Sequence, residues 1–271
     1  NCFRYLPELV KEGKIALAEI DRAVSQVLEL KFSMGLFENP YVDQARALKI
    51  SKDPGSRKLA LKAAHESIVL LKNDGLLPLK KNKYKKIAVI GPCAKDVFMG
   101  GYAGEPYQKV TLFDGIKEKA GNKTELLFAQ GVKLTTNATI PFFNWKLDEI
   151  IFPSPEENMK LIKQAVAVAR KSDIVILAIG ENEHLCREAW AKTHIGDNMT
   201  LDLISQQDDL VKAVVETGKP VVVYLMNGRP LSINYIEKNV SAIVEGWYMG
   251  QETGAAAADI LFGDVNPSGK L

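Results

Sequence analysis

Four short apolar runs, each closed by a glycine turn, constrain most strongly what this chain can fold into. They cover residues 86–90, 173–179, 220–226 and 241–246. The runs are rich in β-branched residues and do not alternate with polar ones, which is typical of strands buried on both faces of a sheet. Segments with apolar residues at helical spacing lie between or after them, at 112–119, 155–169, 201–216 and 250–262. This alternation predicts an α/β fold: a mostly parallel sheet with helices on both faces, an α/β sandwich.

The first 55 residues follow a different pattern. Five apolar residues at helical spacing predict a helix that ends at Gly35: Ile20, Val24, Val27, Leu28 and Phe32. Pro40 cannot continue a helix because it lacks an N–H, and residues 42–55 are polar and irregular, as in a linker. We therefore predict a domain boundary near residue 46, then a helix over 56–71, a strand over 125–129 and a long loop over 131–153.

Charge and composition exclude several classes of protein. Lys and Arg number 35 against 33 Asp and Glu, so the net charge of +2 argues against a nucleic-acid partner. The apolar runs are far shorter than the ~18 residues of a membrane span, so no membrane partner is expected. Three scattered cysteines do not form a disulfide framework. The chain begins at Asn1 without a Met or a signal peptide, and we expect it to be a fragment.

In parallel sheets the loops that leave the carboxyl ends of the strands form the ligand crevice. The loop over residues 91–104 contains glycines, but it has neither the G-x-x-x-x-G-K-[ST] spacing of a phosphate loop nor the G-x-G-x-x-G spacing of a dinucleotide site. No nucleotide or other cofactor is therefore expected. Tyr102 follows two glycines and could present its ring as a flat platform for a sugar face. The alternative is a tyrosine that packs in a turn.

The loop over residues 180–197 concentrates carboxylates, histidines, an arginine and a tryptophan. Its possible metal ligands are His184, Glu188, His194 and Asp197, but their spacing matches no compact metal signature, so no metal is expected. A carboxylic acid beside the Trp190 ring fits better, because burial there would raise a glutamate pKa toward the range useful to a general acid. A solvated polar loop is the alternative. Arg229 and Trp247, in the next two loops, are predicted to be structural braces.

Several ordered motifs extend this picture over the whole chain. They are His65-Glu66-Ser67-Ile68-Val69-Leu70-Leu71-Lys72-Asn73, Gly100-Gly101-Tyr102, Arg187-Glu188-Ala189-Trp190, Asn227-Gly228-Arg229-Pro230-Leu231, Trp247-Tyr248-Met249-Gly250-Gln251-Glu252 and Phe262-Gly263-Asp264-Val265-Asn266-Pro267. Together they resemble glycoside hydrolase family 3, the β-glucosidase and β-xylosidase family.

The resemblance implies a two-domain active site. Members have a (β/α)₈-type barrel followed by an α/β sandwich, with the site between them. Residues 1–45 would be the last helix of an N-terminal barrel domain missing here and the interdomain linker, and residues 46–271 the sandwich. The family cleaves a terminal β-linked sugar with retention, through one carboxylate nucleophile and one acid/base. The nucleophile, an Asp of the barrel, would lie outside this chain, and the periplasm or the cell exterior would be the usual compartment.

The resemblance also implies roles for particular residues. Glu188 takes the position of the acid/base, with Glu183 as the second choice, and the substrate-binding candidates are Tyr102, Arg187, Trp190 and His194. The whole protein would be a retaining exo-β-glycosidase acting on β-linked oligosaccharides, most simply a β-glucosidase, and the chain alone would be inactive. The alternatives are a β-xylosidase of the same family and a non-catalytic carbohydrate-binding α/β domain.

Overall fold

The structure, a computed structural model, describes residues 2–137, 150–186 and 200–271. The chain divides into two compact units, Asn1–Asp53 and Pro54–Leu271. The first unit contains a 3₁₀ turn and three helices: η1 (Cys2–Tyr5), α1 (Leu6–Lys11), α2 (Leu17–Ser33) and α3 (Gln44–Ser51). From Phe3 to Asp53 no residue is buried within the structure. The assignment of this unit to the end of a barrel stays a prediction.

Two expectations for the first unit have different outcomes. The helix predicted to end at Gly35 is confirmed by α2. The irregular linker predicted over 42–55 is wrong, because α3 lies within it. Asp43 caps this helix: its Oδ1 accepts hydrogen bonds from the backbone N–H groups of Ala45 and Arg46, at 2.9 and 3.1 Å. Such a cap satisfies first-turn donors that would otherwise lack partners.

The second unit is built on one mixed sheet. Its six strands in the described residues are β1 (Val69–Asn73), β2 (Lys86–Ile90), β3 (Glu125–Ala129), β4 (Ile174–Gly180), β5 (Val221–Met226) and β6 (Ala242–Glu245). Their order is β1-β6-β5-β4-β2-β3. All neighbours are parallel except β1, which pairs with β6 in the antiparallel direction, with Val69 opposite Glu245. The mostly parallel sheet is confirmed.

Strand β1 corrects the prediction of one helix over 56–71. Helix α4 (Pro54–Ser67) ends at Ser67, and the apolar residues that follow it pair with β6 instead of continuing the helix. A short apolar run fits a buried helix turn and a strand equally well, so the free edge of β6 decides its conformation.

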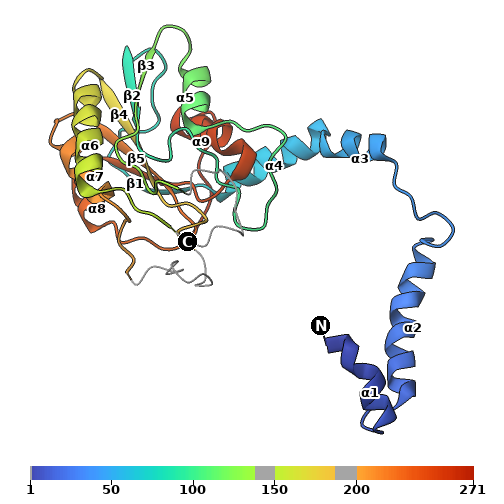
Figure 1. The fold of residues 1–271 in the computed structure, drawn as a ribbon. Helices are drawn as coiled ribbons and strands as arrows, with labels where there is room; N and C mark the ends of the chain where they lie inside the picture. Colours follow the sequence, from blue (N-terminus) through green and yellow to red (C-terminus); the bar gives the residue numbers. More distant parts are fainter. Residues whose placement is uncertain (1, 138–149, 187–199) are drawn as a thin grey trace. The chain divides into compact units, whose positions relative to one another are not determined.

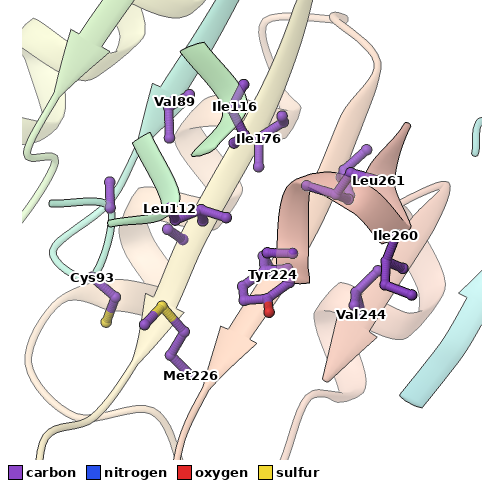
Figure 2. Close-up of a cluster of buried hydrophobic side chains, with 14 of the residues drawn as sticks. Val89, Cys93, Leu112, Ile116, Ile176, Tyr224, Met226, Val244, Ile260 and Leu261 are labelled. Carbon is purple, nitrogen blue, oxygen red and sulfur yellow. The ribbon is translucent and has the colours of Figure 1, made fainter. Parts of the chain in front are cut away.

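Helices cover both faces of the sheet (Figure 1). Helices α4, α5 (Leu112–Ala120) and α9 (Thr253–Leu261) pack on one face, and α6 (Pro155–Arg170), α7 (Gln207–Val215) and α8 (Asn234–Asn239) on the other. Figure 2 shows part of the core under α5 and α9, where Ile116 of α5 lies beside Val89 and Ile176, and Ile260 and Leu261 of α9 lie beside Val244 and Tyr224. The buried strands β4 and β5 therefore have apolar partners on both sides, which explains their unbroken apolar sequence.

Two helix boundaries differ from the sequence pattern. Helix α7 begins at Gln207 and not at 201, because Ser205 has a positive φ of 59° and its hydroxyl donates a hydrogen bond to the Lys133 carbonyl at 3.0 Å. The closing helix divides into η2 (Gly250–Glu252) and α9. By contrast, α6 begins at Pro155 as predicted, with the Ser154 hydroxyl accepting the Glu157 N–H at 3.2 Å.

Candidate active site

The order in which successive strands are added to the sheet reverses between β2 and β4. From β2 the chain passes through α5 to β3, whereas from β3 it returns through α6, on the opposite face, to β4 on the other side of β2. Open α/β sheets bind ligands outside the carboxyl ends of their strands at such a switch point. Two loops meet this description: the β2–α5 loop (residues 91–111) and the segment of residues 181–206, here called the β4–α7 segment.

Glycine ends both strands for a steric reason. Gly180 has a φ of +144°, and a Cβ there would lie 1.9 Å from the Met226 carbonyl oxygen. Gly91 has a φ of +129°, and its Cβ would lie 1.9 Å from the Ala178 carbonyl oxygen. Only glycine allows the backbone to leave the sheet this close to its neighbouring strand. The glycines that mark the strand ends in the sequence are thus requirements of the switch point.

Glu183 joins the two loops. Its side chain is buried, and Oε1 accepts a hydrogen bond from the Met99 backbone N–H at 3.3 Å. Burial raises the pKa of Glu183, while hydrogen bonds from backbone amides, those of Met99 and Gly100 included, oppose the rise. The carboxyl group of Glu183 therefore anchors the β2–α5 loop, and its pKa lies above the ordinary value of a glutamate.

Glu181 and Arg229 form a buried ion pair behind this contact. Glu181 is fully buried, and the Arg229 side chain is 13% exposed. Arg229 Nε donates to Glu181 Oε2 at 2.9 Å, and Arg229 Nη2 donates to Oε1, which gives a bidentate contact. The Cys186 thiol also donates to Oε2 of Glu181. Burial first, and then the Glu181 charge, raise the pKa of Cys186, which favours the neutral thiol over the nucleophilic thiolate.

A second buried carboxyl group lies at the end of β6. Glu245 Oε1 accepts the Trp247 backbone N–H at 2.9 Å, and Oε2 accepts Asn227 Nδ2 at 3.2 Å. Burial raises the pKa of Glu245 to about 7, although these two hydrogen bonds favour the charged carboxylate and so lower the pKa. Trp247 itself has a positive φ of 54°, and its indole Nε1 donates to the Ser67 carbonyl at 3.1 Å. The predicted bracing roles of Arg229 and Trp247 are confirmed by these contacts.

The predicted site residues are only partly described. Tyr102 lies in the β2–α5 loop with 95% of its surface exposed, and Glu183 is buried 81 positions later in the sequence beside Met99. The remaining candidates lie outside the described residues: Arg187, Glu188, Trp190 and His194. The sequence analysis did not predict the buried roles of Glu181 and Glu245. The signal that could have found them is a carboxylate placed directly at the end of an apolar strand.

Among the described residues, neither a metal-ligand cluster nor the two cavities given below add a ligand site at the carboxyl ends of the strands. Within the ranges that the structure describes, no three His, Cys, Asp or Glu side chains lie together as metal ligands, and no helix is long and apolar enough to cross a membrane. Of the possible ligands considered above, only His184 is described, and it is buried. Two cavities of about 330 and 200 Å³ lie elsewhere, the first beside Lys119 and Asp259 and the second beside Leu70 and Pro267.

The sequence profile of the glycosyl hydrolase family 3 C-terminal domain matches residues 68–271, which include every strand described above. The chain belongs to glycoside hydrolase family 3. The family and the α/β fold expected from the motifs are therefore both confirmed.

Similar proteins in the family match the chain almost end to end. The periplasmic beta-glucosidase of Salmonella typhimurium is 40% identical over 279 aligned residues, which cover 99% of this chain and 35% of that protein. A beta-xylosidase of Formosa agariphila is 37% identical, over 98% of this chain and 34% of its own length. The chain thus spans about a third of the length of these curated family 3 relatives.

Solved structures agree with this assignment. A β-glucosidase from Erythrobacter marinus superposes with a TM-score of 0.87 at 37% identity, over 97% of this chain and 36% of that chain. A β-glucosidase from Listeria innocua, solved in complex with glucose, gives a TM-score of 0.76 at 33% identity, over 98% of this chain and 33% of the other.

Proposed function

We propose that this chain is the acid/base half of a retaining exo-β-glycosidase that removes terminal β-linked glucose from oligosaccharides. The observation that carries the proposal is the position of the β4–α7 segment: it leaves the sheet at the switch point and contains both candidate acids, Glu183 and Glu188. A β-xylosidase is the second candidate, since a beta-xylosidase is 37% identical to this chain. The similarity to a periplasmic enzyme supports a periplasmic or secreted location.

The proposed reaction divides two carboxyl groups between two domains. Glu188 protonates the leaving glycosidic oxygen while a carboxylate of the barrel domain, an Asp in the resemblance, attacks the anomeric carbon. The ionised Glu188 then removes a proton from the water that attacks the glycosyl-enzyme, which restores both groups. Since this chain is proposed to lack the nucleophile, we expect it to be inactive without its barrel.

Glu188 is preferred to Glu183 for a geometric reason. Glu183 is buried and already accepts the Met99 N–H, so its carboxyl group is committed to joining two loops. Its raised pKa would suit a general acid, and for that reason it stays the second choice. Tyr102, 95% exposed in the facing loop, is proposed as the sugar platform. Arg187, Trp190 and His194 are proposed to contact the substrate.

The test compares substrates that need an acid with substrates that do not. In the protein joined to its barrel, Glu188→Gln is expected to lower kcat on an unactivated β-linked disaccharide by about 10²- to 10⁴-fold. Turnover of the dinitrophenyl glycoside, whose leaving group needs no proton, should fall far less in its first, glycosylation step. Added azide should then accelerate the second step, because it attacks the anomeric carbon without general-base help. Glu183→Gln is the matched control.

The results of these measurements distinguish the proposed function from its alternatives. If Glu183→Gln gives the acid-specific loss and Glu188→Gln does not, the roles are exchanged. If both variants keep full turnover, or the joined protein hydrolyses neither glucosides nor xylosides, the non-catalytic carbohydrate-binding domain is the better reading. Initial rates on p-nitrophenyl β-glucoside and β-xyloside decide between the two sugars. Hydrolysis by the 271 residues alone would place both carboxyl groups in this chain.

A further inference from the structure

A single guanidinium contacts both ends of the β4–α7 segment. Arg229 binds Glu181, the first residue after β4, through two nitrogens. Its Nη1 also donates to the Thr200 carbonyl at 2.9 Å, and Nη2 lies 3.4 Å from the Asp202 carbonyl. Arg229 belongs to neither end, since it follows β5 in the turn after Met226. Glu181 at the start of the segment and Thr200 near its end, 19 positions apart, are thus held by one side chain from a third element.

Backbone hydrogen bonds hold the residues on both sides of the Arg229 contact. The backbone N–H of Glu181 donates to the Met226 carbonyl at 2.9 Å, so the start of the segment is fixed to β5. At the other end the Leu201 carbonyl accepts the Ser232 N–H at 2.7 Å, three residues after Arg229. Around the carboxylate, Cys186 donates its thiol to Glu181 and lies 3.5 Å from the Tyr248 hydroxyl. A planar fork with five donors can make this set of contacts, whereas a lysine ammonium cannot.

We propose that Glu181 and Arg229 are a positioning pair for acid catalysis: by fixing the two ends of the β4–α7 segment relative to each other, they set where the acid/base group stands. This inference rests on the proposed function of that segment. The pair lies at the carboxyl edge of the sheet, where Glu181 directly follows β4 and Arg229 follows β5, so its contacts tie the segment to the ends of these two strands.

Arg57 provides a matched control. Like Arg229, it donates through Nε to a buried glutamate, here Oε1 of Glu252 at 3.0 Å. It lies on α4 and contacts neither end of the β4–α7 segment in any hydrogen bond described. Arg57→Lys therefore perturbs a pair of the same chemistry at a different place. If Arg229→Lys does not fold, Glu181→Gln is the test variant in its place, and Glu252→Gln is its control.

The experiment uses the protein joined to its barrel and measures two quantities. The first is kcat and KM on the unactivated disaccharide and on the dinitrophenyl glycoside. Arg229→Lys is expected to lower kcat on the disaccharide by about 10- to 100-fold, as a displaced catalytic group does, with KM unchanged and a much smaller loss on the activated glycoside. Arg57→Lys should leave both substrates at the wild-type rate.

The second quantity is hydrogen exchange of the amides at 181–186 and 200–206, which needs no catalysis. Arg229→Lys should accelerate exchange at both ends, and Arg57→Lys at neither. Equal behaviour of the two lysine variants, or an equal loss on both substrates, would overturn the positioning role. Should Glu188→Gln and Glu183→Gln both keep full turnover, the proposed function fails separately. Exchange then decides whether the pair holds the two ends.

Discussion

At the scale of single residues, the burial of Glu245 should make the free energy of unfolding depend on pH. Its buried carboxyl group accepts hydrogen bonds from Asn227 and from the Trp247 amide, and burial raises its pKa to about 7. The native state therefore keeps a proton that the unfolded chain releases near its ordinary pKa of 4.5. Because the native state then binds more protons, the free energy of unfolding should decrease as the pH rises from about 4.5 to about 7.

Glu245→Gln should remove that dependence. The quantity to compare is the free energy of unfolding of the variant minus that of the wild type. This difference should be on the order of 3 kcal/mol more in favour of the variant at pH 8 than at pH 4.5. Urea unfolding at both pH values measures this change. Glu66→Gln, on exposed α4 surface, is the control and should give the same difference at each pH. An equally constant difference for Glu245→Gln would mean that its carboxyl group titrates normally in the folded protein.

At the scale of elements, Gln207 joins the end of β4 to the start of α7. Its Oε1 accepts the Gly180 N–H at 2.9 Å, and its Nε2 donates to the Gly180 carbonyl at 2.8 Å and to the Ile204 carbonyl at 3.0 Å. The side chain is fully buried. At the switch point the Gly180 N–H and carbonyl have no neighbouring strand among the described residues to bond, and the Gln207 side chain supplies their partners.

Gln207→Ala should leave buried backbone groups of Gly180 without partners. The expected loss is about 2–4 kcal/mol in the free energy of unfolding, measured with urea, since each unsatisfied buried group costs about 1–3 kcal/mol. Gln130→Ala, at an exposed glutamine, should change it by less than about 0.5 kcal/mol. Similar values for both variants would show that water or a backbone shift replaces the Gln207 contacts.

At the scale of the whole molecule, neither apolar core contains a buried residue before Ala64: one begins at Ala64 and the other at Ala88. The unit from Asn1 to Asp53 contributes no buried residue from Phe3 onward. We therefore expect residues 54–271 to fold without the first unit.

A chain shortened to residues 54–271 should fold with a midpoint of thermal unfolding within about 4 °C of the full chain, or about 1 kcal/mol. A chain that starts at residue 75 is the comparison. It lacks α4 and β1, and with them the buried Ala64, Ile68 and Val69, so it should not fold cooperatively. Loss of folding in the first of these two chains would mean that the N-terminal unit stabilises the sandwich.

How far the sequence predicts the molecule depends on the range of the signal. Apolar runs and glycine stops act within a few residues, so they predict β2 to β6, α2 and α6 closely. The sequence motifs also identify the family. Strand β1 was missed because its conformation depends on β6, about 170 positions further along the chain.

The sequence alone therefore determined the α/β class, the ends of the strands and the loops in which the site would lie, because each of these follows from local pattern and backbone sterics. The pairing of the buried polar side chains was decided by tertiary structure alone. Glu181 and Arg229 lie 48 positions apart, and Glu245 and Asn227 lie 18 apart. They meet because β4, β5 and β6 are neighbours in the sheet, and strand order is a property of the folded chain that no local pattern contains.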